Sequence, residues 1–302
     1  MSHCALVYSL LKIRLTKPIH HIDIFYFKNL IKRMIEIDKF VTSSVNSLNK
    51  MRRKILEIST HAKEGHIPSS FSILEILYTL YGAPVLKRLP KESMNMDDRL
   101  IFSKGHGSLA LYAVLAEVGL IGNKDLHSFC EFDSICGGHP DRTKSKHFET
   151  SSGSLGHGLP IAVGLALNYK RKFDTLSPKV FCLMGDQEAT EGTTWESLLV
   201  AGSRKLNNLV CIIDFNKSGE RSLPLNNFKD LFRGFGITIK EVNGHSIREL
   251  YDVFTSSSRS GPTIIIANTI KGYGLPIMEN SPEWHHKFPS EVELNEMLKR
   301  LK

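Results

Sequence analysis

Two oxygen-bearing side chains, Asp186 and Asn216, lie 30 residues apart in this sequence, and each follows an apolar run. The runs are KVFCLM and NLVCIID, so both residues are expected at the ends of buried strands. A carboxylate and a carboxamide at such positions suit a hard divalent cation that also binds a phosphate group. The residues alone leave a second interpretation open, in which Asp186 caps a helix and Asn216 forms a turn.

The elements that must position these two residues are helices and strands in alternation. Apolar residues recur at intervals of three and four over 38–62, with Gly65 as a stop, and a second helix is expected from Ser70 to Gly82. The remaining expected elements are a strand at 100–102, a helix ending at Gly119, helices at 160–172, 193–203 and 246–256, and strands at 179–184, 209–214, 237–242 and 263–269.

This alternation predicts an α/β fold, a parallel sheet with helices on both faces. Ligands of such sheets bind at the carboxyl ends of the strands, where Asp186 and Asn216 are expected. Residues 133–158 are rich in Gly, Ser and His and have no regular period, so they are expected to form long ordered loops. Loops of this kind commonly serve function.

Composition and charge exclude several classes of protein. No apolar run approaches the roughly 18 to 20 residues of a membrane span. The net charge of +8 comes wholly from the first 56 residues, which hold 11 basic and 3 acidic side chains, so it indicates a basic extension rather than a nucleic-acid surface. Five sparse cysteines and the lack of a signal peptide argue against a disulfide framework. We therefore expect a cytoplasmic protein that neither crosses a membrane nor binds nucleic acid.

Several segments, in their order and spacing, resemble the N-terminal, thiamine-diphosphate-binding half of transketolase. The matching segments are GHIPSSFSILEILYTLY at 65–81, DRLIFSKGHGSLALYAVL at 98–115, GGHP at 137–140, SSGSLGHGLPIAVGLAL at 151–167, GDQEATEGTTWESLLVAG at 185–202 and NGHSIREL at 243–250. The resemblance implies one thiamine-diphosphate-binding α/β domain of the diphosphate-binding type over residues 36–302. Residues 1–35 would be a basic N-terminal extension.

The resemblance also implies how the chain binds thiamine diphosphate with Mg²⁺ or Ca²⁺. Asp186, Asn216 and the backbone carbonyl of Ser218 would be the metal ligands, which agrees with the preference of these ions for oxygen. Two positions depart from the family's pattern, since Gln187 stands where Gly is usual and His157 where Gln is usual. The implied cofactor-binding residues are Gly153, Leu155, Gly156, Gly185, Asp186, Gln187, Asn216, His106 and His285.

Histidines and glutamates make up the implied catalytic set. Imidazole near its solution pKa suits the proton transfers that the family's histidines assist. His286 competes with His285 for one of these roles, and Glu191, with Glu196, matches acidic residues at the family's subunit interface. The implied catalytic residues are His66, His106, His139, His285 and Glu191.

The implied function is that of the N-terminal subunit of a two-chain transketolase. In transketolases the glutamate that contacts the cofactor's pyrimidine ring lies in the second half of the polypeptide, so a partner subunit would supply the pyrimidine-binding domain and this catalytic Glu. The assembly, expected as α2β2, would transfer a two-carbon ketol unit from a ketose, usually phosphorylated, to an aldose. Two alternatives stay open: a thiamine-diphosphate-dependent ligase or synthase subunit for a specialised sugar or secondary metabolite, and a non-catalytic remnant that binds a partner.

Overall fold

The computed structural model describes residues 21–87, 97–174, 177–219, 223, 228–256 and 260–301. By its internal contacts the chain divides into two units, Met1–Ser43 and Ser44–Lys302. Helix α2 (His21–Ala62) begins at His21 rather than at residue 38, where the apolar period starts. Residues 1–20 of the predicted extension lie outside the described residues, and its boundary at residue 35 stays a prediction.

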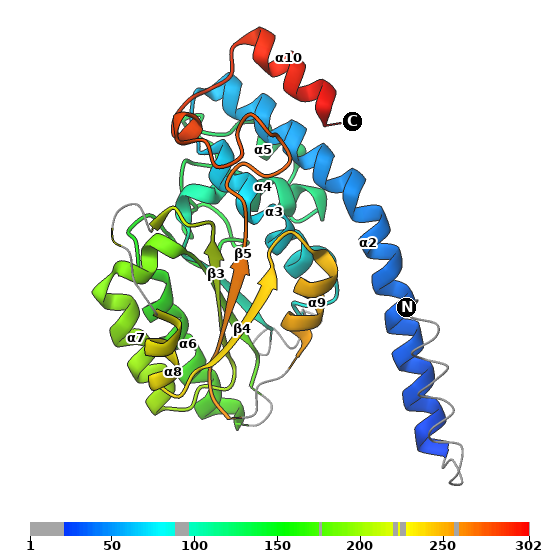
Figure 1. The fold of residues 1–302 in the computed structure, drawn as a ribbon, viewed down its shortest axis with the longest axis vertical. Helices are drawn as coiled ribbons and strands as arrows, with labels where there is room; N and C mark the ends of the chain where they lie inside the picture. Colours follow the sequence, from blue (N-terminus) through cyan, green and yellow to red (C-terminus); the bar gives the residue numbers. More distant parts are fainter. Residues whose placement is uncertain are drawn as a thin grey trace. The chain divides into compact units, whose positions relative to one another are not determined.

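Five parallel strands form one sheet in the order β1-β2-β3-β5-β4 (Figure 1). The strands are β1 (Arg99–Phe102), β2 (Val180–Gly185), β3 (Leu209–Phe215), β4 (Thr238–Asn243) and β5 (Thr263–Asn268). The order and the shared direction of the strands confirm the predicted parallel α/β sheet.

Helices cover both faces of this sheet. Helices α6, α7 and α8 lie on one face, and α9 lies on the other beside α3 (Figure 1). Within the described residues no helix combines the length and apolar character needed to cross a membrane. The helices are α3 (Ile67–Gly82), α4 (Ser108–Glu117), α5 (Asn123–His127), α6 (Gly158–Phe173), α7 (Gly192–Ser203), α8 (Phe228–Gly234), α9 (Ile247–Thr255) and α10 (Glu291–Arg300), with short 3-10 turns η2 (Gly105–Gly107), η4 (Asp186–Thr190) and η6 (Pro282–His285).

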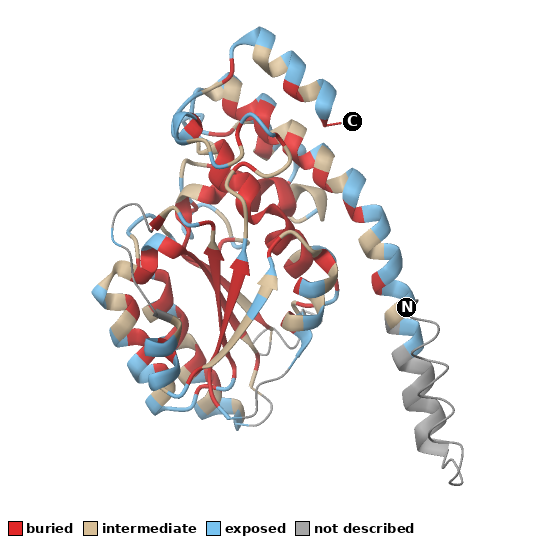
Figure 2. Ribbon diagram, in the orientation of Figure 1, coloured by how far each residue is buried: buried red, intermediate tan, exposed pale blue. Residues whose placement is uncertain are grey.

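Alternate strand residues face opposite sides of the sheet, as the two-residue period of a strand requires. Val180, Cys182 and Met184 belong to the buried cluster beneath α6, α7 and α8. Phe181 instead packs against Phe254 of α9, with ring centroids 6.1 Å apart. Figure 2 shows β3 and β5 buried along almost their whole length, whereas the edge strand β4 is partly exposed.

Some helix boundaries differ from the predicted ones. Helix α3 begins at Ile67, so the predicted N-cap at Ser70 is wrong. Pro68 occupies the first turn, where its missing N–H costs no hydrogen bond and its fixed φ suits a helix. The sequence pattern does not predict α5 and α8, because 5 and 7 residues hold too few apolar positions to show a helical period.

The parallel arrangement brings four chain segments to one edge of the sheet. Ser103 follows β1, Asp186 follows β2, Asn216 follows β3 and Thr269 follows β5. The backbone amide of Ser103 donates to the Leu183 carbonyl oxygen at 2.9 Å, which extends the pairing of β1 with β2 past the end of β1. Polar residues from distant parts of the sequence therefore meet at the carboxyl edge, as predicted.

Candidate functional site

Asp186 and Asn216 lie on two turns that contact each other. Asp186 opens η4 at the end of β2, and Asn216 follows β3. A Cβ atom placed on Gly219 would come within 3.2 Å of the Asp186 carbonyl carbon, so a glycine favours this close approach. The backbone amides of Gly219 and Gln187 also donate hydrogen bonds to the Asp186 carboxylate. The structure therefore brings the two predicted metal-ligand turns together.

The Asp186 carboxylate has one oxygen without a partner. The residue is 9% exposed, and its Oδ2 atom makes no hydrogen bond within the described part of the chain. Burial, followed by the negative charge of Asp214, raises the pKa of Asp186. A buried carboxylate oxygen without a donor is unfavourable by itself, and a hard cation would satisfy it. This donor set fits a divalent metal ion.

Hydrogen bonds determine which way the Asn216 carboxamide points. Its Nδ2 donates to Asp214 Oδ2 at 2.9 Å and to Ser72 Oγ at 3.1 Å, so its Oδ1 faces the other way. Oδ1 accepts from the Ser218 backbone N–H at 3.1 Å and has a second lone pair that suits a metal. Lys217, between them, has a φ of +63°, a left-handed conformation that is uncommon outside glycine and frequent at functional turns.

The buried Asp214 joins several segments beneath this site. Its carboxylate accepts hydrogen bonds from Ser72 Oγ at 2.7 and 2.9 Å, from the Thr269 hydroxyl and from the Lys104 ammonium. The side chains of Lys104 and Asp214 are 2% and 0% exposed. Lys104 also donates to the Ser69 carbonyl oxygen at 3.2 Å. A buried charge pair whose hydrogen bonds are satisfied in this way holds the end of β3 and the turn that carries Asn216 in one arrangement.

Glu188 is a second buried carboxylate that joins separate segments. Its Oε1 accepts hydrogen bonds from the Ser103 hydroxyl and from the Gly156 amide at 3.0 Å, and its Oε2 accepts from the Gly185 amide at 2.8 Å. Burial raises the pKa of Glu188, while these hydrogen bonds oppose the shift. The carboxylate thus links the end of β2 to the glycine-rich loop at 153–158.

Glu188→Gln is expected to destabilise the fold by about 1 to 3 kcal/mol, because a carboxamide exchanges one acceptor oxygen for a donor and leaves a buried amide or hydroxyl unpaired. Urea unfolding of the chain measures this loss. Glu196→Gln, an exposed change on α7, is the matched control and should change the free energy of unfolding by less than about 0.5 kcal/mol. Equal stability of the two variants would contradict the linking role of Glu188.

The loop that carries Gly153, Leu155 and Gly156 lies against the start of α7. The φ of Gly156 is +74°, and a Cβ placed on it would come within 2.7 Å of the Glu191 Cβ, so both backbone and space require glycine. Glu191 is half-buried at the N-cap of α7. The ring of His157 makes a hydrogen bond to the Leu155 carbonyl oxygen at 2.9 Å, which helps to hold the loop.

The four predicted histidines gather near the start of α3. The His66 ring centroid lies 5.5 Å from that of His106 and 5.4 Å from that of His285. His139 packs against the turn that carries His106. Lys271, which the sequence motifs do not single out, places its Nζ 2.9 Å from His285 Nδ1. The structure therefore collects these imidazoles from separate loops and places one cationic side chain against His285.

Reduced contact with water lowers the pKa values of three of these histidines, although the His285 side chain stays accessible at the surface. The pKa of His106 falls to about 2 and that of His285 to about 4, and the positive charges of Lys104 and Lys271 respectively are the next causes. Burial also lowers the pKa of His66. Neutral imidazoles have one donor and one acceptor nitrogen, so these three side chains can both donate and accept hydrogen bonds near neutral pH.

These shifts predict that histidine burial destabilises the fold in acid. The unfolded chain protonates histidines below about pH 6.5, while the folded chain keeps them neutral, so their contribution to stability falls as the pH drops. When the pH falls from about 7 to about 5, the free energy of unfolding should therefore decrease less in His106→Gln than in the wild type. The difference should be at most about 1.4 kcal/mol per pH unit. Urea unfolding at both pH values measures the difference.

His127→Gln, which changes an exposed histidine on α5, is the control and should follow the wild type. An identical pH dependence in the wild type and in His106→Gln would contradict the assignment of a neutral, buried His106. The comparison of variants is needed because the buried carboxyl groups of Asp186 and Glu188, whose pKa values are raised, act in the opposite direction.

The two residues that depart from the family's pattern, Gln187 and His157, both have common backbone conformations. Gln187 lies outside the left-handed region and its side chain is exposed. His157 has a φ of −88° and is also exposed. Gln187 therefore does not need the conformational freedom of the glycine that is usual at its position.

Several buried or cationic site residues are not singled out in the sequence, although three of them, Ser72, Lys104 and Glu188, lie within the matching segments. One usable signal is a charged residue inside an apolar run, as with Asp214 in NLVCIID, because a buried charge must be paired. The residue that pairs with such a buried charge cannot be identified in the same way, because it comes from a distant segment of the sequence. The missed residues are Ser72, Lys104, Glu188, Asp214 and Lys271.

Known proteins are similar in sequence to this chain. Residues 43–301 match the family model described as transketolase, thiamine diphosphate binding domain. A protein of Actinobacillus succinogenes, named as one subunit of apulose-4-phosphate transketolase, is 39% identical over 265 residues, which cover 83% of this chain and 93% of that protein. Human transketolase is 36% identical over 247 residues, which cover 80% of this chain and 39% of that protein.

Solved transketolase structures share the fold. The Campylobacter jejuni enzyme superposes with a TM-score of 0.72 at 25% identity, over 87% of this chain and 46% of that chain. The Leishmania mexicana enzyme superposes with a TM-score of 0.75 at 23% identity, over 86% of this chain and 41% of that chain. This chain therefore spans less than half of each of these three transketolase chains. From the family match and the identity to its relatives, the chain belongs to the transketolase family and forms its N-terminal, thiamine-diphosphate-binding domain.

Proposed function

We propose that this chain is the cofactor-binding subunit of a two-chain transketolase, which transfers a two-carbon ketol unit from a phosphorylated ketose to an aldose. The observation that carries the proposal is the buried Oδ2 of Asp186, which has no hydrogen-bond partner among the described residues and lies near the oriented carboxamide of Asn216. Two relatives, of whose lengths the matches cover 93% and 91%, are each named as one subunit of apulose-4-phosphate transketolase. Apulose-4-phosphate is therefore the first donor to test.

The proposed ligands of Mg²⁺, or of Ca²⁺, are Asp186, Asn216 and the backbone carbonyl of Ser218. The support is their chemistry, because all three offer oxygen and the turns that carry them are in contact. The buried carboxylates of Asp214 and Glu188 would keep these turns in place. The remaining proposed cofactor contacts are Gly153, Leu155, Gly156, Gly185, Gln187, His106 and His285.

The proposed catalytic histidines are His66, His106, His139 and His285. They would orient substrate hydroxyl groups and assist the proton transfers of the reaction. Thiamine diphosphate, when bound, supplies the electron sink that carbon–carbon bond cleavage needs. Lys271 would add a positive charge that suits anionic phosphate next to His285.

A partner subunit is part of the proposal. It would supply the pyrimidine-binding domain and the catalytic Glu, most simply in an α2β2 assembly. The proposed interface acids are Glu191, the N-cap of α7, and Glu196 within α7. On the same helix Leu199 and Val200 are 55% and 41% exposed, which suits a protein interface. A cytoplasmic setting fits the free thiols of the described cysteines.

Calorimetry with thiamine diphosphate and Mg²⁺, with and without the partner subunit, tests the function. We expect Mg²⁺-dependent binding and ketol transfer from a ketose phosphate only when both chains are present. Use of a different acceptor would instead favour the ligase or synthase alternative. Absence of binding under both conditions would refute both enzymatic functions and leave the non-catalytic remnant.

A further inference from the structure

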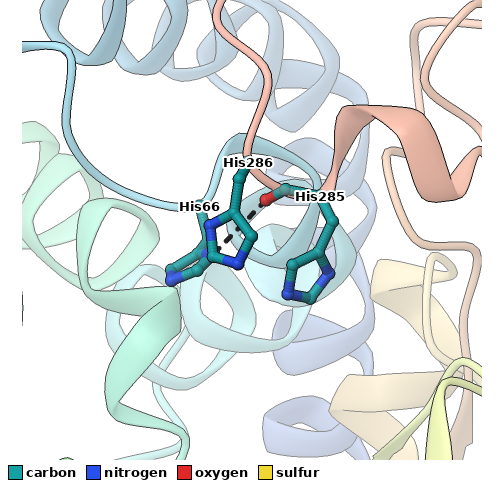
Figure 3. Close-up of side chains that lie close together, drawn as sticks. All are labelled: His66, His285 and His286. Atoms are coloured by element: carbon teal, nitrogen blue, oxygen red, sulfur yellow. Dashed lines mark hydrogen bonds between the residues drawn. The ribbon is translucent and has the colours of Figure 1, made fainter.

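We propose that His66, His285 and His286 form a binding site for a divalent transition metal ion such as Zn²⁺, and that the bound ion inhibits the enzyme. Among the described side chains, this is the only group of three or more His, Cys, Asp or Glu residues whose ligand atoms all lie within 4.8 Å of one another. Figure 3 shows the three rings gathered at one place, with His66 before α3 and the other two at the end of η6.

The ring geometry allows an ion to bind after small side-chain rotations. The His286 centroid lies 4.7 Å from that of His66 and 4.5 Å from that of His285. Tetrahedral zinc with bonds of about 2.0 to 2.1 Å places its ligand nitrogens about 3.4 Å apart, so each pair has to close by at most about 1.4 Å. His285 and His286 are exposed, so their rings have room to rotate and the ion has a path from solvent.

One imidazole is already in a tautomer that suits a metal. His66 Nδ1 lies 3.4 Å from the backbone oxygen of His285, drawn as a dashed line in Figure 3. A carbonyl oxygen can only accept, so Nδ1 carries the proton and the lone pair is on Nε2. Metal-binding histidines commonly donate their second ring N–H to a carbonyl in this way.

Lys271 is the group that competes with the ion. Its ammonium lies 2.9 Å from His285 Nδ1 and occupies the lone pair of that nitrogen. Coordination through Nδ1 therefore requires the ammonium to leave, and its positive charge opposes a cation at this place. The site should consequently bind more tightly when this ammonium is removed.

The two metal sites of the chain differ in chemistry. Imidazole nitrogen favours Zn²⁺, Ni²⁺ and Cu²⁺, whereas the carboxylate and carbonyl oxygens of Asp186, Asn216 and Ser218 favour Mg²⁺ and Ca²⁺. Saturating Mg²⁺ should therefore not displace Zn²⁺ from the histidines. Inhibition rests on the proposed function, in which His66 and His285 handle substrate protons, whereas metal binding itself does not.

Titration calorimetry of the full chain with ZnCl₂, in saturating Mg²⁺ and without thiamine diphosphate, tests the site. We expect one saturable site in the wild type. His286→Ala should weaken Zn²⁺ binding by at least about tenfold, because even the loss of a residue that only hydrogen-bonds to a metal ligand costs roughly that much. His127→Ala, which changes an exposed histidine outside the group, should bind as the wild type does. Equal affinity of the wild type and His286→Ala, or no saturable binding, would overturn the site.

Two further measurements check the geometry. Co²⁺ should give the visible absorption of a tetrahedral site in the wild type and lose it in His286→Ala, while an octahedral spectrum in the wild type would overturn the site. Lys271→Met should bind Zn²⁺ more tightly than the wild type, and equal or weaker binding would contradict the competition at His285. All of these measurements omit the cofactor and the partner, so they succeed or fail independently of the proposed transketolase activity.

The inhibition is measured with both chains present. If ketol transfer is established, Zn²⁺ should inhibit the wild-type enzyme over the concentration range in which it binds. His286→Ala should require at least about tenfold more Zn²⁺ for the same fractional inhibition, in line with its weaker binding. Inhibition at equal Zn²⁺ concentrations in both proteins would show that the ion acts elsewhere.

Discussion

Asp186→Asn is expected to weaken Mg²⁺-dependent binding of thiamine diphosphate by on the order of 100-fold, which corresponds to about 2.7 kcal/mol. The carboxamide has nearly the same shape but no charge, so the metal loses its anionic protein ligand. Calorimetry of the two-chain assembly over a range of Mg²⁺ concentrations measures the effect.

The same substitution should raise the stability of the metal-free chain. Burial and the nearby charge of Asp214 raise the pKa of Asp186, so its ionised form is unfavourable in the fold without a cation. Asp186→Asn removes this unfavourable charge and should raise the midpoint of thermal unfolding without Mg²⁺. Mg²⁺ and cofactor should then stabilise this variant far less than the wild type.

Asp230→Asn is the matched control, because Asp230 lies on the surface in an exposed ion pair with Arg233. It should leave both cofactor binding and unfolding close to those of the wild type. If Asp186→Asn bound cofactor with unchanged Mg²⁺ dependence, Asp186 would not be a metal ligand. If it also left the metal-free stability unchanged, the ionised Asp186 carboxylate would not be unfavourable in the fold without a cation.

Lys104→Met is expected to destabilise the fold by about 3 to 5 kcal/mol, because it leaves Asp214 as an uncompensated charge with no access to water. The double variant Lys104→Met with Asp214→Asn removes that charge and should recover part of the loss. Urea unfolding of the three proteins, together with the Asp214→Asn single variant, forms a double-mutant cycle that isolates the coupling between the two residues.

The comparison pair is Lys229 with Glu241, whose side chains are 33% and 43% exposed. Lys229→Met removes the same chemical group from a solvated ion pair and should cost no more than about 1 kcal/mol. A loss in Lys104→Met as small as that in Lys229→Met would contradict the buried pair. A double variant less stable than Lys104→Met would indicate that the hydrogen bonds to Asp214 outweigh its charge.

The ion pair between Lys104 and Asp214 could not be predicted from the sequence. The two residues are 110 positions apart, and β2 lies between β1, which ends just before Lys104, and β3, which carries Asp214. The Lys104 stem passes Gly185, where an added Cβ would lie 3.8 Å from its Cδ. The pairing therefore depends on the strand order and on space at the end of β2, neither of which has a local sequence signal.

The first residue of α3 also could not be predicted from the sequence, although only neighbouring residues are involved. Ser70 is a good N-cap residue, but Pro68 is equally suited to a first turn, and the sequence does not rank the two. In the fold, Ser70 is buried inside the helix. Packing of the whole first turn, rather than the preference of one residue, decides where the helix begins.

The sequence by itself determined the family, the parallel sheet and the turns that carry the proposed metal ligands. These follow from local information, because strand and helix periods and the motifs around Asp186 and Asn216 each lie within a few tens of residues. Only the tertiary structure decided that Lys104 pairs with Asp214, that Glu188 joins three segments and that His286 lies beside His66. Those contacts depend on how distant strand ends and loops meet in space. Contacts between distant segments produce no periodic pattern of residues from which they could be predicted.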